Sequence, residues 1–281
     1  MRKNILVLGK GFIGERIGRE LGCRVSGAGI NSFSDADRLL GRYRPEIVIN
    51  CIGSSGRRNV DDCEEDKEAT LLANSFIPLM LAEACLRRGI KLVHISTGCI
   101  FNFDYRKDKP IKEGERNYFL KLFYSRSKIY SEAALEALSE KAGILILRIR
   151  IPLLDESHPR NILDKLVKYE KIVDVPNSVT YLPDFIRALK HLIGVGAVGV
   201  YNVVNKGGLR YSELMKVYRK YLPGPDFKFV SVRKLPLTRT NLLLSVAKLE
   251  RTGFKVRDIH SVLDECLKHY VDSLRNPVKH K

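Results

Sequence analysis

"NILVLGKGFIGERIGREL" fills residues 4–21 and holds three local patterns that together decide the fold. Residues 4–9 form an apolar run with the length of a buried strand. A glycine-rich turn follows, and Ile13, Ile17 and Leu21 then recur with the spacing of one face of an α-helix. The stretch therefore predicts a strand, a tight glycine turn and a helix in direct succession.

The same alternation of apolar runs and helical stretches continues along the first half of the chain. The pairs that follow are "RVSGA" with "SDADRLLGRY", "EIVINCIG" with a helical stretch from about 65 to 89, "KLVHIST" with a helix around residue 124, and finally "GILILRIRI". Ser34 is the expected N-cap of the first of these helices. Such alternation predicts an α/β fold of the Rossmann type, a doubly wound parallel sheet with helices on both faces.

From Pro152 onward the alternation becomes irregular and richer in proline, asparagine and charged residues. We expect residues 1–155 to form a nucleotide-binding domain, to which residues 179–204 return. Residues 156–178 and 205–281 are then expected to form a smaller C-terminal lobe that binds the substrate.

Composition narrows the class of protein. The chain has 281 residues, of which 44% are hydrophobic, enough for a sizeable core. No run of about 18 apolar residues and no secretory leader stands out, so we expect a cytoplasmic protein without a membrane partner. The six cysteines form no CxxC pair and the histidines form no HExxH motif, so the sequence predicts reduced thiols and no metal site.

The formal net charge of +17 favours an anionic partner such as a nucleic acid, an acidic membrane or a phosphorylated small molecule. Lysine and arginine are scattered along the whole chain, and no interleaved basic and aromatic signature of nucleic-acid binding is present. We therefore expect no specific nucleic-acid partner, and the charge alone does not choose among the other anions.

Gly9, Gly11 and Gly14 give the G-x-G-x-x-G pattern between a strand and a helix, which is the context that dinucleotide binding requires. The pyrophosphate would lie at the helix N-terminus, where N–H groups and the helix dipole favour negative charge. "GAGINSF" follows the second strand and lacks the acidic residue that binds a ribose 2′-hydroxyl. This absence favours NADPH over NADH, with Lys10 or Arg16 as partners of the 2′-phosphate.

Tyr124 and Lys128 are four residues apart in a helical segment, so their side chains share one face. Such a pair is by itself most often a solvated surface. Next to a nucleotide site the pair can be catalytic. A nearby ammonium favours the phenolate and so lowers the tyrosine pKa toward neutral pH, where the tyrosine can act as a general acid. Thr97, at the C-terminal end of a strand, can hold the same substrate oxygen.

With these residues in place, the sequence resembles the extended short-chain dehydrogenase/reductase superfamily over nearly its whole length. More narrowly it is similar to dTDP-4-dehydrorhamnose reductases, and most to the plant-type bifunctional enzymes that also epimerise the sugar. The segments that carry the resemblance are "GRRNVDDCE" (56–64), "TGCIF" (97–101), "FYSRSK" (123–128), "LRIRIP" (147–152), "HPRNILDKLVKYEKIVDVPNSVT" (158–180), "RTN" (239–241) and "LSVAKLERTGF" (244–254).

The resemblance implies an NADPH-dependent reductase of the 4-keto group of a nucleotide-linked 4-keto-6-deoxyhexose, which yields UDP- or dTDP-rhamnose. It implies that reduction uses Thr97, Tyr124 and Lys128. The cofactor contacts that it implies are Gly9, Lys10, Gly11, Phe12, Ile13, Gly14, Cys51, Ile52, Gly53, Asn74, Tyr124 and Lys128. The substrate contacts that it implies are Arg160, Asn161, Tyr181 and Arg239, the last near the diphosphate.

The resemblance further implies 3,5-epimerisation, with Cys99 and Lys165 as the acid–base pair. The hydrogens at C3 and C5 are acidic because each lies next to the C4 carbonyl, so a base on one face and an acid on the other could exchange them. Taken as residues alone, Cys99 could equally be a small buried hydrophobe and Lys165 a solvated helix residue.

Two other functions stay open at this point. One is a plain 4-keto reductase that needs a separate epimerase. The other is a non-catalytic nucleotide-binding protein, similar to the regulatory subunit of methionine adenosyltransferase. Thr97, Tyr124 and Lys128 together favour an enzyme, because a scaffold has no need of all three. A homodimer is a candidate assembly, and the base of the nucleotide is not determined by the sequence.

Overall fold

In the computed structural model, which describes residues 3–224, 226, 228–230 and 239–276, the chain divides into two compact units. Unit 1 consists of Met1–Phe101, Arg116–Arg148 and Gly196–Tyr201. Unit 2 consists of Asn102–Glu115, Ile149–Val195 and Asn202–Lys281. The chain therefore passes between the units several times.

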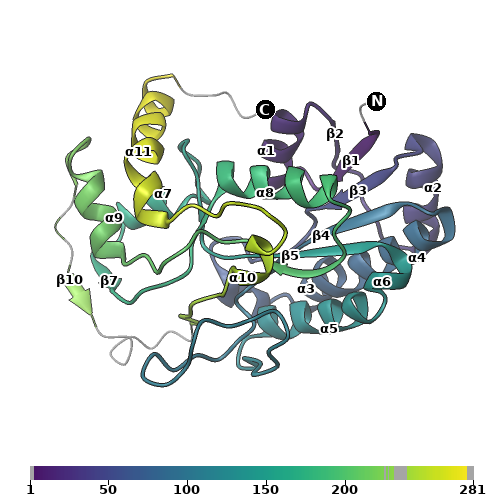
Figure 1. Ribbon diagram of the computed structural model, residues 1–281, viewed down its shortest axis with the longest axis horizontal. Helices are drawn as coiled ribbons and strands as arrows, with labels where there is room; N and C mark the ends of the chain where they lie inside the picture. The colour runs from purple at the N-terminus through teal and green to yellow at the C-terminus, as the bar shows by residue number, and fades with distance from the viewer. Residues whose placement is uncertain (1–2, 225, 227, 231–238, 277–281) are drawn as a thin grey trace. The chain divides into compact units, whose positions relative to one another are not determined.

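Unit 1 is built on a six-stranded sheet with the strand order β2-β1-β3-β4-β5-β9 (Figure 1). Its strands are β1 (Ile5–Leu8), β2 (Arg24–Ser26), β3 (Ile47–Asn50), β4 (Lys91–Thr97), β5 (Ile144–Ile149) and β9 (Gly199–Asn202). Its helices are α1 (Phe12–Leu21), α2 (Phe33–Tyr43), η1 (Val60–Glu64), α3 (Lys67–Leu71), η2 (Leu72–Phe76), α4 (Ile77–Arg88), α5 (Phe123–Ala137) and α6 (Ser139–Ala142).

The strand order confirms the predicted doubly wound fold. β1 pairs in parallel with β2 on one side and with β3 on the other, and β3 pairs in parallel with β4. The order of strands thus reverses between β1 and β3, and in open sheets of this kind ligands bind beyond the carboxyl ends of the strands at such a reversal. The glycine turn after β1 lies at this point.

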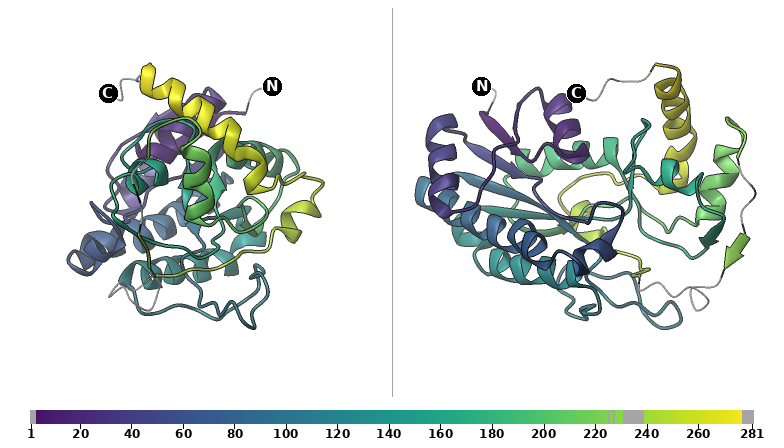
Figure 2. Two further views of the ribbon diagram at one scale, coloured as in Figure 1. Left: turned by 90° about the vertical axis from the view of Figure 1, so that its left-hand side faces the viewer. Right: turned by 180° about the vertical axis from the view of Figure 1, so that it is seen from behind.

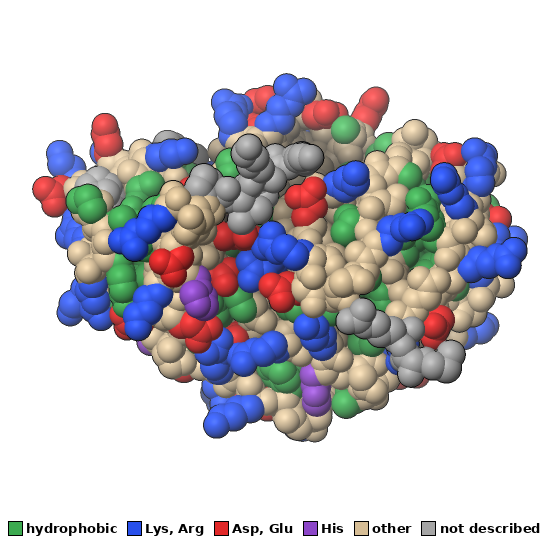
Figure 3. Space-filling view, turned by 90° about the horizontal axis from the view of Figure 1, so that it is seen from above, with side chains coloured by type: hydrophobic (Ala, Val, Ile, Leu, Met, Phe, Trp, Pro, Cys, Tyr) green, Lys and Arg blue, Asp and Glu red, His purple; other side chains and the backbone are tan. Residues whose placement is uncertain are grey.

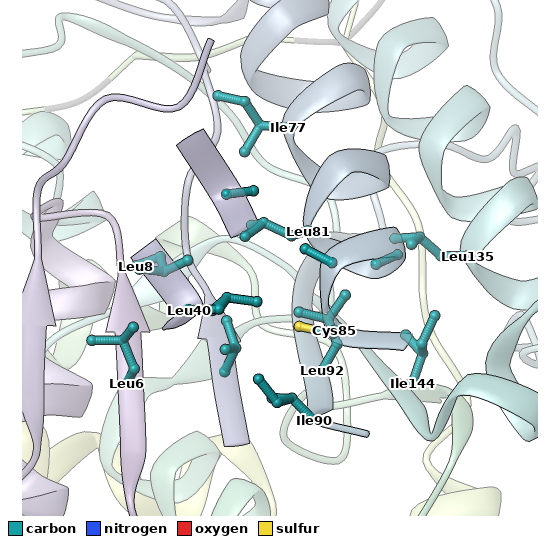
Figure 4. Packing of buried hydrophobic residues seen from close by; sticks show 14 of the residues in the cluster. Leu6, Leu8, Leu40, Ile77, Leu81, Cys85, Ile90, Leu92, Leu135 and Ile144 are labelled. Carbon is teal, nitrogen blue, oxygen red and sulfur yellow. The ribbon is translucent and has the colours of Figure 1, made fainter. Parts of the chain in front are cut away.

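Helices cover both faces of this sheet. Figure 2 shows α1 on one face and α4 with α5 on the other, and α2 and α4 contact each other. The apolar layer beneath α4 and α5 is drawn in Figure 4, where Leu6, Leu8 and Leu92 of the strands form one cluster with Leu81 and Leu135 of the helices. The strand residues alternate in direction, so every second side chain joins this layer.

Helix α2 begins at Phe33, and its cap differs from the predicted one. Ser32 is the N-cap, because its extended backbone lets its hydroxyl accept the Asp35 N–H at 3.2 Å. The Asp35 carboxylate in turn accepts the Ser32 hydroxyl at 2.9 Å. The prediction of Ser34 as the cap was wrong, since Ser34 already lies in the first helical turn.

The segment Lys67–Arg88 runs through α3, η2 and α4 and is long and apolar enough, by length and composition, to cross a membrane. The sequence predicted a helical stretch here, from about 65 to 89, but no apolar run of this length. Half of its apolar window is buried, and Ile77, Leu81 and Cys85 pack in the layer against the sheet. Burial of this kind is that of a core helix. The middle turn, η2, is a π-helix.

Unit 2 is made of shorter elements. They are β6 (Pro152–Leu153), α7 (Ile162–Leu166), β7 (Lys171–Val173), β8 (Thr180–Tyr181), α8 (Leu182–Gly194), α9 (Tyr211–Tyr218), β10 (Lys228–Val230), α10 (Ala247–Glu250) and α11 (Ile259–Arg275). β6 pairs with β8 and β7 with β10, each in parallel. A second apolar core joins α7, α9 and α11 through residues such as Leu163, Leu214 and Leu263.

The division into units differs from the expected domain boundaries in three places, the first of which is that residues 149–155 belong to unit 2. Residues 102–115 belong to unit 2, where Ile111 exchanges backbone hydrogen bonds of 2.8 Å with Leu243 and Ser245. Only 196–201 of the segment expected to return at 179–204 belongs to unit 1. Pairing over such sequence distances leaves no mark in the local alternation of strands and helices.

Candidate functional site

The glycine turn after β1 is packed too tightly for side chains at two positions. Gly9 has φ +101°, and a Cβ there would lie 2.9 Å from the carbonyl carbon of Cys51. A Cβ on Gly14 would lie 2.0 Å from the carbonyl oxygen of Gly9. These contacts hold the start of α1 directly against the turn and require glycine at both positions.

Gly11 differs, because no atom lies within 4 Å of the place its Cβ would take. It is the N-cap of α1, and no side chain caps the helix there. The backbone is thus open to a ligand at a helix N-terminus, where N–H groups and the helix dipole favour an anion. The turn fits the pyrophosphate of a dinucleotide.

The two predicted partners of a 2′-phosphate are placed differently. The stem of the exposed Lys10 lies over Gly27, just after β2, where a Cβ would come within 2.9 Å of the lysine Cδ. Arg16 is buried and forms an ion pair of 3.0 Å with Glu20 on the same helix. Lys10 is therefore the better placed of the two beside the end of β2.

The loop after β3 brings the second cofactor segment next to α5. A Cβ on Gly53 would lie 3.0 Å from the Lys128 Nζ and 3.2 Å from the Asn74 Oδ1. Gly53, Asn74 and Lys128, which are far apart in sequence, thus share one location in unit 1. Cys51 lies at the start of this loop, and burial raises the pKa of its thiol to about 12, so the thiol stays protonated.

Asn74 holds that location together. Its amide oxygen accepts the Ser54 N–H at 2.8 Å, and its amide nitrogen donates to the Ser54 carbonyl at 2.9 Å and to the Ser127 hydroxyl at 3.0 Å. Ser75 donates to the Ser127 carbonyl at 2.6 Å, and Ser131 donates to the Asn74 carbonyl at 2.7 Å. The π-helical turn is thereby joined to both the β3 loop and α5.

Lys128 is 5% exposed. Burial lowers the pKa of its ammonium from 10.5 to about 8, and Glu132 opposes this shift. Its neighbour one turn earlier on α5, Tyr124, is half-buried. The predicted pair therefore lies on one helix, with a lysine whose charge titrates just above neutral pH.

Thr97 and Cys99 lie at the end of β4 and in the turn that follows. The Cys99 N–H donates to the Thr97 hydroxyl at 3.1 Å, and the Cys99 carbonyl accepts the Ser125 hydroxyl at 2.6 Å. The second bond ties this turn to the first turn of α5. Thr97, Tyr124, Lys128 and Cys99 all belong to unit 1.

In unit 2, Arg160 lies just before the short helix α7 and Lys165 lies on it. Both are half-buried. Burial lowers the pKa of Lys165, and the neighbouring Arg160 charge lowers it further. Cys99 and Lys165 belong to different units, so their action as an acid–base pair stays a prediction.

Asn161 and Tyr181 lie in the interior of unit 2. Asn161 is fully buried and caps α7, with its side chain bonded to the backbone of Leu154 at 3.0 and 3.2 Å. Tyr181 is also fully buried, and its hydroxyl bonds to Glu265 at 3.3 Å. Their contact with the substrate stays a prediction, and Asn161 also shapes the turn that carries Arg160.

Arg239 is half-buried and directly precedes Thr240, which is held by a buried residue that the sequence did not single out. Arg150 is 3% exposed and donates to Asn177 at 2.9 Å and to the Thr240 hydroxyl at 3.0 Å. Asn177 also accepts the Leu242 N–H at 3.1 Å. This Arg150 clamp fixes the segment that carries Arg239. The "LRIRIP" motif places Arg150 directly after an apolar strand, which indicates a buried charge, but the sequence does not show which residues it binds.

On the face seen in Figure 3, Lys and Arg side chains are interspersed with Asp and Glu side chains and form no continuous patch. Among the residues that the structure describes, no group of three or more His, Cys, Asp or Glu side chains gathers as metal ligands would.

The family model described as the RmlD substrate binding domain matches residues 8–180. A bifunctional dTDP-4-dehydrorhamnose 3,5-epimerase/dTDP-4-dehydrorhamnose reductase of Arabidopsis thaliana is 33% identical over 239 residues, which cover 80% of this chain and 77% of that protein. A trifunctional UDP-glucose 4,6-dehydratase/UDP-4-keto-6-deoxy-D-glucose 3,5-epimerase/UDP-4-keto-L-rhamnose-reductase of the same plant is 29% identical, and the match covers 94% of this chain but only 41% of that protein.

Solved structures agree. The L780 UDP-rhamnose synthase of Acanthamoeba polyphaga mimivirus superposes with a TM-score of 0.85 at 25% identity and covers 94% of this chain and 99% of that one. A dTDP-4-dehydrorhamnose reductase of Bacillus anthracis in complex with NADP has the same fold, with a TM-score of 0.80 at 21% identity over 95% of this chain and 99% of that one. The glycine turn, the end of β4 and the Tyr124–Lys128 helix all fall within the matched residues, and the chain belongs to the RmlD substrate binding domain family.

Proposed function

We propose that this protein uses NADPH to reduce the 4-keto group of a nucleotide-linked 4-keto-6-deoxyhexose. The observation that carries the proposal is the meeting of Gly53, Asn74 and Lys128 at one location beside the glycine turn of unit 1. Tyr124 lies one helical turn from Lys128. Membership of the family and the names of the relatives agree with this chemistry.

Residues of unit 1 are assigned to binding of NADPH. Gly9, Gly11 and Gly14 hold the pyrophosphate, and Lys10 meets the 2′-phosphate beside Gly27. When bound, NADPH supplies the reducing equivalent to C4. Further cofactor contacts come from Phe12, Ile13, Cys51, Ile52, Gly53 and Asn74.

Tyr124 gives its phenolic proton to the C4 oxygen as that oxygen gains negative charge. The Lys128 ammonium favours the phenolate that remains, and Thr97 donates a hydrogen bond to the same oxygen. With the pKa of Lys128 lowered to about 8, the ammonium is the major form at neutral pH and is lost above that value. Activity should therefore decline on the alkaline side.

We propose in addition that the protein epimerises C3 and C5 before reduction. Cys99 and Lys165 are the residues assigned to this step. The support is the lowered pKa of Lys165, which makes a neutral amine more accessible as a base, together with the names of the bifunctional and trifunctional relatives. A plain reductase lacks this step.

Binding of the substrate diphosphate is assigned to Arg239 with Arg160, because guanidinium groups pair bidentately with phosphate oxygens. UDP and dTDP derivatives share this group, and both are candidate substrates. The cytoplasmic location and the homodimer inferred from the sequence are part of the proposal.

The test mixes purified protein with NADPH and either UDP- or dTDP-4-keto-6-deoxyglucose in heavy water. We expect loss of the absorbance of the reduced cofactor and a rhamnose product with deuterium at C3 and C5. Reduction without deuterium would leave a plain 4-keto reductase. NADPH binding without turnover of either sugar would instead favour the non-catalytic regulatory protein.

A further inference from the structure

A group of buried charged and polar side chains joins β4, α5 and β5 in unit 1. The Glu132 carboxylate, 2% exposed, accepts the Ser96 hydroxyl with one oxygen. Its other oxygen accepts Nε and Nη2 of Arg148 at 2.9 and 2.5 Å. The Arg148 guanidinium lies 4.9 Å from the centre of the Phe101 ring. A buried ion pair between Glu132 and Arg148 therefore joins α5 to β5.

A buried ion pair is weak evidence for stability, because the loss of hydration offsets most of the attraction. Its position here is informative. Ser96 directly precedes Thr97, and Glu132 follows Lys128 by four residues on α5. Glu132 therefore contacts the strand that carries one proposed reduction residue and lies one helical turn from another.

Charged and titratable groups face Lys128 from several elements. Glu132 on α5 raises the pKa of Lys128, whereas Cys51 in the β3 loop and Cys63 in η1 would raise it only as thiolates. His94 on β4 faces it as well, bonded through Nδ1 to Asn50 at 3.1 Å. Burial holds the pKa of His94 well below 6.5, so His94 is neutral, and the burial-raised pKa of Cys51 and Cys63 keeps those thiols neutral too. Glu132 is the carboxylate among these groups.

We propose that Glu132 is a positioning residue for the reduction, which ties the strand end carrying Thr97 to α5 and keeps a negative charge one helical turn from the Lys128 ammonium. The inference rests on the proposed function through the role of Lys128. It assigns two effects to one carboxylate, and these can be separated by mutation.

The charge effect is tested with Glu132→Gln/Arg148→Met, which removes both charges and leaves no unpaired buried ion. Without the carboxylate, the pKa of Lys128 falls further below about 8. We expect the alkaline limb of the kcat profile to move to lower pH by about one unit, the shift that a nearby opposite charge produces. The pH dependence of NADPH affinity, followed by cofactor fluorescence, should move with it.

The tying effect is tested with Ser96→Ala, which keeps both charges. We expect kcat to fall while the alkaline limb stays in place. The matched control is Glu136→Gln, one turn further along α5, where the carboxylate pairs with Arg116 at 3.0 Å on the surface. This variant should keep the wild-type kcat and pH profile.

The outcomes are distinguishable from failure of the proposed function, because wild-type protein must first reduce a 4-keto sugar nucleotide. If it does and the double variant, shown by urea denaturation to be folded, keeps the wild-type alkaline limb in both kcat and NADPH affinity, the inference about Glu132 is wrong. If the double variant does not fold, Glu132→Gln/Arg148→Gln, which also leaves no unpaired buried charge, gives the same test. An alkaline limb that moves equally in Glu136→Gln would also overturn it.

Discussion

The candidate residues of unit 1 and those of unit 2 are held in different ways. Lys128 and Asn74 are buried on long helical segments, and hydrogen bonds to neighbouring elements fix Asn74. Arg160, Lys165 and Arg239 are half-buried, on a five-residue helix or in irregular backbone. The comparison indicates that the proposed reduction depends on a rigid sheet and helix framework, whereas the proposed substrate contacts depend on short segments that a few buried residues fix from behind.

The largest effect should come from unit 1. Tyr124→Phe removes the proposed proton donor and keeps the ring, so we expect kcat to fall by about 10²–10⁴-fold, the usual contribution of a positioned general acid. NADPH affinity should change little, and fluorescence titration of the cofactor checks this. Wild-type turnover in this variant would show that Tyr124 is not the proton donor.

The next effect should come from unit 2 and leave reduction intact. Lys165→Ala removes the proposed base, so incorporation of solvent deuterium should fall by at least about 100-fold. Cys99→Ser, in unit 1, should act in the same way, because it removes the other member of the proposed acid–base pair. Mass spectrometry of the product made in heavy water measures this, and each variant should still oxidise NADPH when given the epimerised 4-keto sugar. Loss of both activities together would show that Lys165 is needed for binding or folding instead.

The rigid framework should also leave a mark on stability. The pKa of Lys128 is about 8 in the folded protein against 10.5 as a free side chain, so the unfolded chain binds more protons between these values. The free energy of unfolding should then rise with pH from about 8 to 10.5, by at most about 3 kcal/mol from this group. Below pH 8 both states are charged and the contribution is constant. Urea denaturation of wild type and Lys128→Met at each pH isolates it, and parallel curves would contradict the burial of a titrating ammonium.

The smallest effect should separate binding from turnover in unit 2. Arg239→Ala removes a proposed diphosphate partner, and loss of one charge-assisted hydrogen bond predicts about a tenfold rise in the substrate KM. The affinity for NADPH should not change. Arg219→Ala is a suitable control, because Arg219 lies in the same unit and pairs with Asp226 at 3.3 Å on the surface. Equal KM values in both variants would show that Arg239 does not bind the substrate diphosphate.

The parts predicted well from the sequence are those that local spacing determines. The glycine turn and the Tyr124–Lys128 pair each lie within one element or one turn, so their geometry follows from a few neighbouring residues. Asn161 and Tyr181 were expected at the substrate because they lie in a matching motif, but sequence does not show that both side chains turn into the core.

Contacts between distant segments could not be predicted. Arg150 bonds to Thr240 across 90 residues, and Ser96 bonds to Glu132 across 36. In each case the polar residue lies in or next to an apolar strand. A polar side chain there indicates a buried partner, but the sequence does not show which residue that partner is. The four-residue spacing of Lys128 and Glu132 was visible in the sequence and could have drawn attention to Glu132.

The π-helical turn Leu72–Phe76 has a consequence for insertions and deletions. Successive side chains of a regular α-helix point about 100° apart, so a helix rarely directs two neighbours at one partner. The wider turn lets Asn74 and Ser75 both bond to α5, at the expense of regular backbone pairing. Deletion of one residue here would give a more regular helix, but every side chain before the deletion would rotate by about 100° relative to those after it. The chain length in this turn is therefore as closely constrained as the identity of its residues.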